Sequence, residues 1–156
     1  MDNPGKATTT KTTFRLECQV GITINASREK VWSILTDAGN YSKWNSTILS
    51  AEGDISLDQV IKLKTTLDPV RTFKLRVTEF SPPSRMVWAD GVSPFFRGTR
   101  TFTLTQRSDG GTDFRRVDVY AGLLFPLVAG ALPDFNSVFE ILAAELKAEA
   151  EKSLES

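Results

Sequence analysis

Apolar and polar residues alternate strictly at the start of the patterned part of the chain. From Phe14 to Ile24 every second residue is apolar, and the residues between them are polar apart from Gly21, a period typical of a strand with one buried face. Ser27 then offers an N-cap, and apolar residues recur at helical spacing until Gly39. We therefore expect a strand, a short helix and a further helical turn.

The middle of the chain predicts six more strands, separated mostly by turn residues such as those at 81–84 and 108–111. Their connections are too short for the crossovers that parallel strands need, so the sheet should be antiparallel. The expected segments are Ile48–Gly53, Val60–Leu67, Phe73–Phe80, Met86–Gly91, Gly98–Gln106 and Thr112–Ala121.

A long amphipathic helix is expected after Pro133, with Asp134 as its cap. Its apolar residues, Phe135, Val138, Phe139, Leu142 and Leu146, are spaced as on one helical face. The fold class is thus α+β, a seven-stranded antiparallel sheet that buries one face against this helix. We expect residues 1–13 to form a flexible leader and residues 14–153 a single domain.

Composition excludes several classes of function. Basic and acidic residues balance at 19 each, so the chain has no overall field for a nucleic acid. It has no histidine and one cysteine, Cys18, which argues against a metal centre or a histidine-dependent enzyme. No apolar run reaches the length of a transmembrane helix, and we expect a cytoplasmic protein.

Several segments, in order, give the chain a resemblance to the START-like (SRPBCC) superfamily, in particular its polyketide cyclase/dehydrase-like branch. The chain departs from the pattern of the family in two respects. The turn at 57–60 lacks an expected glycine, and the chain has no histidine, which some members use in proposed catalytic sites. The similar segments are Ile22–Asp37, Tyr41–Asn45, Val77–Phe80, Arg85–Trp88, Gly98–Leu104, Gly110–Thr112 and Ala121–Leu124.

This resemblance implies a helix-grip fold, in which the sheet curls around the C-terminal helix and leaves a cavity for a small hydrophobic molecule. Arg100 should point inward because it is two residues from Phe102. For the strand 112–121, periodicity slightly favours turning Val117 and Val119 inward. Alignment with the family instead puts Phe114, Arg116, Asp118 and Tyr120 on the concave side, and we follow it.

Two interpretations of these charged residues stay open. In the first, Arg100 or Arg116 orients a ligand oxygen while Asp118 or Tyr120 transfers a proton in an aldol-type cyclisation or dehydration. In the second, they form a satisfied cross-strand ion pair with a tyrosine beside it, and we favour this one. Further candidates for ligand contact are Trp44, Trp88, Phe95, Phe96, Phe102, Phe135, Phe139 and Leu142.

The apolar run from Leu123 to Leu132 has two interpretations as well, a buried connection, which we favour, or a gate or membrane-touching surface at the cavity mouth. For the whole protein we rank three functions. The first is binding of a polyketide-, aromatic- or lipid-like ligand, without a cofactor. The second is a cyclase or dehydratase, and the third a protein-interaction module.

Overall fold

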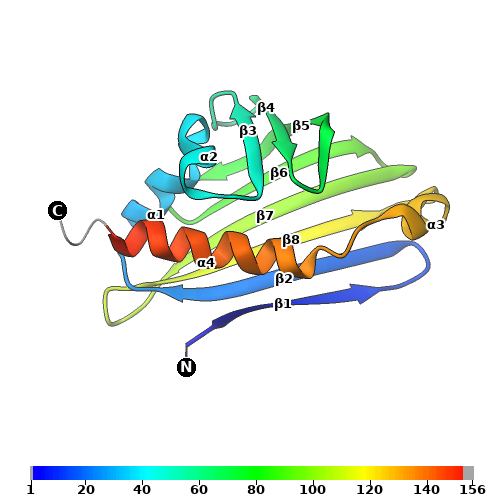
Figure 1. The fold of residues 1–156 in the computed structure, drawn as a ribbon. Coiled ribbons are helices and arrows are strands. Elements are labelled where there is room, and N and C mark those ends of the chain that lie inside the picture. Colours follow the sequence, from blue (N-terminus) through cyan, green and yellow to red (C-terminus); the bar gives the residue numbers. More distant parts are fainter. Residues whose placement is uncertain (1, 153–156) are drawn as a thin grey trace.

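The computed structural model describes residues 2–152, which form one curved antiparallel sheet and a long helix lying across its concave face (Figure 1). The sheet has eight strands in the order β1-β2-β8-β7-β6-β5-β4-β3. This is the expected α+β helix-grip fold, with one strand more than predicted. The proposed domain end at residue 153 lies outside the described residues.

The additional strand is β1 (Pro4–Lys11), which falls within the expected leader. It pairs antiparallel with β2 (Arg15–Ile24). Its sequence has no apolar alternation because most of its side chains are exposed, and its position comes from backbone pairing with β2. The prediction of an unstructured segment was therefore wrong for residues 4–11.

The remaining elements follow the predicted order closely. Helix α1 (Arg28–Leu35) has Ser27 as its N-cap, whose side chain accepts a hydrogen bond from the backbone N–H of Lys30. The short helices η1 (Ala38–Asn40) and α2 (Tyr41–Trp44) lead into the sheet. Its middle strands are β3 (Ile48–Glu52), β4 (Val60–Thr65), β5 (Asp68–Ser81), β6 (Arg85–Val92), β7 (Phe96–Gln106) and β8 (Thr112–Ala121).

The turn between β3 and β4 explains how the chain does without the expected glycine. Asp58 has φ of 67° there, in the left-handed region that glycine favours and that aspartate tolerates better than most residues. Its backbone N–H donates to the carbonyl of Val77, and its own carbonyl accepts from Arg76. These hydrogen bonds hold a conformation that the side chain disfavours.

After β8 the chain passes through α3 (Phe125–Val128) and η2 (Ala129–Ala131) into the long helix α4 (Asn136–Lys152). Asp134 accepts a hydrogen bond from the backbone N–H of Asn136, as expected for a cap. Helix α4 buries Phe139, Leu142, Ala143, Leu146 and Ala150. Its contacts with the sheet are mainly to β1 and β2.

Within residues 2–152 no single helix is long and apolar enough to cross a membrane. The α3–η2 segment and α4, bent by 75° where they meet, reach that length and composition only when taken together.

Candidate functional site

Strand register brings the chemically interesting residues into neighbouring rows on the concave face. Asp118 of β8 lies opposite Cys18 of β2 on one side and Arg100 of β7 on the other. Arg100 in turn lies opposite Trp88 of β6. The next row holds Arg116 opposite Phe102. Because cross-strand partners share a face, these side chains meet beneath α4.

Arg116 and Asp118 are buried, with 4% and 1% of their surfaces exposed. The family alignment therefore chose the correct face of β8, against the slight preference of the periodicity. The sequence alone was ambiguous because the strand carries charged residues on one face and valines on the other. Val117 and Val119 lie half-buried on the convex side.

The Asp118 carboxylate is the centre of a three-residue ion cluster. Arg116 donates from Nε to Oδ1 at 3.1 Å and from Nη2 to Oδ2 at 3.0 Å. Arg100 donates from Nε to Oδ2 at 3.2 Å, and the Tyr120 hydroxyl lies 3.5 Å from the same oxygen. The predicted group of Arg100, Arg116, Asp118 and Tyr120 is thus assembled at one place.

Burial and charge set the protonation states of this cluster. Burial alone would raise the pKa of the Asp118 carboxyl, but the charges of Arg100 and Arg116 outweigh it and hold the pKa below its ordinary value. Burial, together with the charge of Asp118, raises the pKa of Tyr120 to about 12. At neutral pH the carboxyl is ionised and the phenol is neutral, so neither group is matched to proton transfer near pH 7.

Burial also lowers the pKa of Arg116, an effect that the charge of Arg100 reinforces, whereas Asp118 raises the pKa of Arg100 despite its burial. The side chain of Arg116 is 5% exposed and that of Arg100 is 15% exposed. Guanidinium groups remain protonated at neutral pH in either case.

Aromatic rings surround the ion cluster. The ring of Tyr120 stacks with Phe96 at 6.4 Å and with Phe135 at 5.4 Å between centroids. The Arg116 guanidinium lies 3.9 Å from the centre of the Phe139 ring, and that of Arg100 lies 5.9 Å from the Trp88 ring. Such cation–π contacts stabilise desolvated cations without neutralising them.

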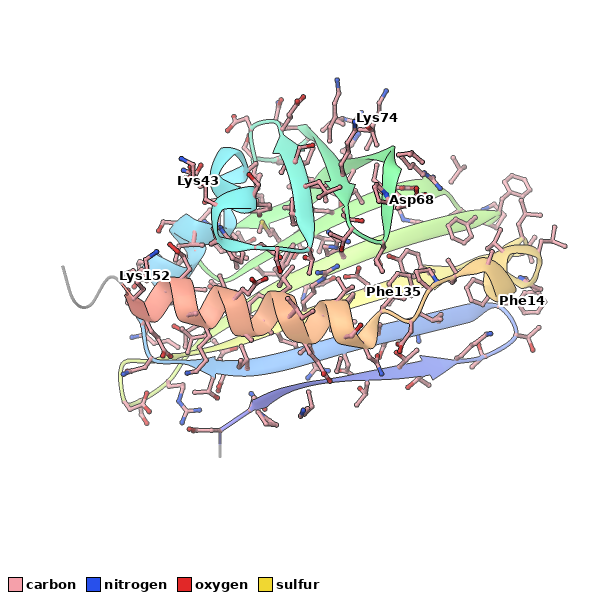
Figure 2. The ribbon with its side chains drawn as sticks, viewed as in Figure 1. Phe14, Lys43, Asp68, Lys74, Phe135 and Lys152 are labelled. Carbon is pink, nitrogen blue, oxygen red and sulfur yellow. The ribbon has the colours of Figure 1, made fainter. Side chains whose placement is uncertain are left out.

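Gly98 makes room for the Tyr120 ring. The two residues are cross-strand partners, and a Cβ atom on Gly98 would lie 3.2 Å from two carbons of the ring. Phe135 also stacks with the Tyr120 ring. Figure 2 shows Phe135 where the chain enters α4 over the sheet.

Some predicted contact residues lie apart from this cluster. Phe95 is 54% exposed in the β6–β7 hairpin. Trp44 packs against Tyr41, with ring centroids 5.6 Å apart, and Leu142 is core on α4. Trp88, in contrast, borders the cluster: it is fully buried, lies opposite Arg100 and packs edge-on against Phe102 at 5.2 Å.

Tyr41 was not among the predicted site residues, although it occurs in one of the motifs similar to the family. It is buried, and its hydroxyl donates to the backbone carbonyl of Leu35. Burial raises its pKa, against the influence of Arg100 and Arg116. The sequence signal was its place in the Tyr41–Trp44 segment, which gives no indication of which way the phenol points.

The apolar run from 123 to 132 is mostly exposed, so its interpretation as a buried connection was wrong. Phe125 is buried, but Leu123, Leu124 and Leu127 are 60%, 45% and 81% exposed. Backbone hydrogen bonds join Leu123 and Leu124 to the β6–β7 hairpin, and the preceding Gly122 donates to the carbonyl of Phe14. Figure 2 shows Phe14 beside α3 at the same end of the molecule.

Two hollows of the surface lie away from the ion cluster. One, of about 390 Å³, is on the convex face of the sheet and is lined by polar side chains including Lys6, Thr103 and Arg115. The other, of about 190 Å³, lies near Asp2 and Arg107. Within residues 2–152 no group of three His, Cys, Asp or Glu side chains is placed to hold a metal ion.

Comparisons with known proteins support the same fold. A structure from Rhodobacter sphaeroides superposes with a TM-score of 0.69 at 18% identity, over 95% of this chain and 99% of its own. A START superfamily protein from Mycobacterium smegmatis gives 0.65 at 16% identity, over 88% and 98%. A norcoclaurine synthase mutant from Thalictrum, solved with a transition-state analogue, gives 0.69 at 8% identity, over 93% and 99%.

A search of curated proteins found no match. The model of one protein family, described as polyketide cyclase / dehydrase and lipid transport, matches residues 8–153. That span includes every strand from β2 onward, the ion cluster and the whole of α4. The chain therefore belongs to the polyketide cyclase / dehydrase and lipid transport family.

Proposed function

We propose that this protein binds a small, mainly apolar molecule between the concave face of the sheet and α4. The observation that carries the proposal is a buried polar cluster enclosed by aromatic rings. Asp118, Arg116 and Arg100 offer fixed polar contacts, while Phe135 and Phe139 supply apolar surface. An apolar site with a few convergent polar groups is typical of small-molecule binding sites.

Entry of a ligand requires side chains to move, because the rings of Phe96, Tyr120 and Phe135 stack on one another. Phe135 precedes the first turn of α4, and its side chain is 9% exposed. A flat or extended apolar molecule that displaced this ring would lie directly against the ion cluster. Tyr120 and one of the two arginines, Arg100 or Arg116, would then orient its oxygen atoms.

A cyclase or dehydratase acting through Asp118 or Tyr120 is the second candidate. The observation that bears on it is the assembly of a carboxylate, a phenol and two guanidinium groups at one place. The lowered pKa of Asp118 and the raised pKa of Tyr120 make both poor proton-transfer groups at neutral pH. We therefore place binding first, enzymatic turnover second and an interaction module third.

Native mass spectrometry of the freshly purified protein tests binding first, with denaturation to release and identify any bound molecule. The second step is thermal unfolding with a panel of lipids, quinones and polyketides. Tyr120→Ala should change the stabilisation that a ligand gives, whereas Val119→Ala, its neighbour on the convex face, should leave it unchanged. A protein that is purified without a bound molecule and that no compound stabilises would contradict the proposal.

A further inference from the structure

The buried ion cluster contains more positive than negative charge. Two guanidinium groups, Arg100 and Arg116, share the single carboxylate of Asp118. Both arginines and the carboxyl are ionised at neutral pH, which leaves one net positive charge beneath α4. Asp90 is the next acidic residue on this face, opposite Gly98, and takes part in none of the ion pairs within residues 2–152.

The interior is also short of hydrogen-bond acceptors. Within residues 2–152, four buried side-chain polar atoms lack a hydrogen-bond partner, and all four are donors. They are Arg28 Nε, Trp44 Nε1, Asn45 Nδ2 and Trp88 Nε1. Buried polar groups are almost always paired in folded proteins, because an unpaired donor loses its hydration without compensation. Of the four, the indole N–H of Trp88 lies on the residue that faces Arg100 across β6 and β7.

One of these donors belongs to the same row as the excess charge. Trp88 is fully buried, and its ring lies 5.9 Å from the Arg100 guanidinium. Arg100 gives Asp118 only its Nε–H, whereas Arg116 gives the same carboxylate two N–H groups. Arg100 is also the more exposed of the two arginines. With one of its five N–H groups bonded to Asp118, against two for Arg116, Arg100 has more donors left for another partner.

We propose that the molecule bound here is an apolar monoanion, whose carboxylate or comparably acidic oxygen pairs with Arg100. This inference rests on the proposed function and narrows it to a ligand class. The Trp88 indole N–H, which has no partner, is a further donor in the same row. A neutral ligand would enclose an uncompensated cation, which is costly, whereas an anion would neutralise it and bring acceptors.

A matched pair of fluorescent probes tests the ligand charge. 1-Pyrenebutyric acid and 1-pyrenebutanol share ring and chain and differ at the terminal carbon, which is a carboxylate in one and a primary alcohol in the other. We expect the wild-type protein at neutral pH to bind the acid about tenfold to a hundredfold more tightly than the alcohol, as for a charge-assisted hydrogen bond. Equal affinity for the two would refute the inference and leave the proposed function standing.

Two arginine variants locate the effect. Arg100→Gln should remove the preference for the acid, while Asp118 retains both of its hydrogen bonds from Arg116. Arg85→Gln is the matched control, since Arg85 pairs with Glu79 on exposed ends of the sheet, and should keep the preference. A preference that survives Arg100→Gln would assign the anion to another site and overturn the proposal.

A third variant, Asp118→Asn, should change the affinity for the acid in the opposite direction to Arg100→Gln. Asp118→Asn frees both arginines and should strengthen binding of the acid, provided that circular dichroism shows it to be folded; if it does not fold, Arg100→Gln alone decides. Weaker binding of the acid by folded Asp118→Asn would contradict the charge argument. If neither probe binds and native mass spectrometry finds no bound molecule, the proposed function fails together with this inference.

Discussion

Replacement of Asp118 by asparagine should destabilise the fold far more than loss of a surface carboxylate. The side chains of Asp118 and Arg116 are only 2% and 5% exposed, so the substitution leaves two neighbouring cations with little solvent to compensate them. Removing one partner of a buried ion pair costs about 3 to 5 kcal/mol. That is a large share of the roughly 5 to 15 kcal/mol that stabilises a typical domain.

Urea unfolding followed by tryptophan fluorescence measures this cost, with Glu79→Gln as the control. Glu79 and Arg85 are 46% and 47% exposed, and an exposed pair contributes about 0 to 1 kcal/mol. The reasoning is refuted if Asp118→Asn loses no more than this control at an unchanged m-value. Adding Arg116→Met to the Asp118→Asn variant should restore part of the stability, because it removes the surplus buried cation.

The stability lost in Asp118→Asn should depend on pH in a defined way. Asp118 has its pKa below the ordinary value of 3.8, so its contribution to stability is complete above that value. It is lost as the pH falls through the lowered pKa. The difference in unfolding free energy between wild type and Asp118→Asn should therefore be constant from neutral pH down to about pH 4 and shrink below it. A difference that already declines near pH 6 would contradict the assignment of the lowered pKa.

Three further predictions concern local geometry. The phenolate absorbance of the native protein should stay absent at pH 10 and rise near pH 12 for Tyr120, with Tyr41 titrating later still; a midpoint at pH 10 would show that neither ring is buried as described. Asp58→Val should cost about 1 to 2 kcal/mol in urea unfolding because of its positive φ, whereas Asp58→Gly should cost nothing or stabilise slightly. Gly98→Val should alter the near-ultraviolet circular dichroism of the Tyr120 ring, while Gly39→Ala, with no atom within 4 Å of its added Cβ, should not.

Much of the fold was predictable because burial imposes a period on the sequence. The strand from residue 14 to 24 and helix α4 each have one buried face, so apolar residues mark them clearly. Strand β1 carries no such signal, since its side chains are mostly exposed and it is held by backbone pairing with β2, the next strand in the chain. Backbone pairing without side-chain burial leaves little trace in a sequence.

The sequence identified the residues of the site, but it said less about which face they occupy and how they contact one another. Alternation places Arg116, Asp118 and Tyr120 on one face of β8, but it does not say whether that face is inside. The sharing of Asp118 by two arginines depends on the β7–β8 register, which aligns Arg100 with Asp118. The orientations of Tyr41 and Phe95 depend on loops and short helices, where no period constrains the side chains.

Cys18 gives the molecule a built-in reporter of opening. It is the only cysteine, it is fully buried, and burial raises the pKa of its thiol. Its Sγ lies 3.5 Å from the side-chain oxygen of Asn136, the first residue of α4. A thiol reagent can therefore react with the native protein only when the structure around Cys18 opens, for example when the start of this helix separates from the sheet. The rate of that reaction measures how often this part of the structure opens. A molecule bound beneath the helix should slow the reaction.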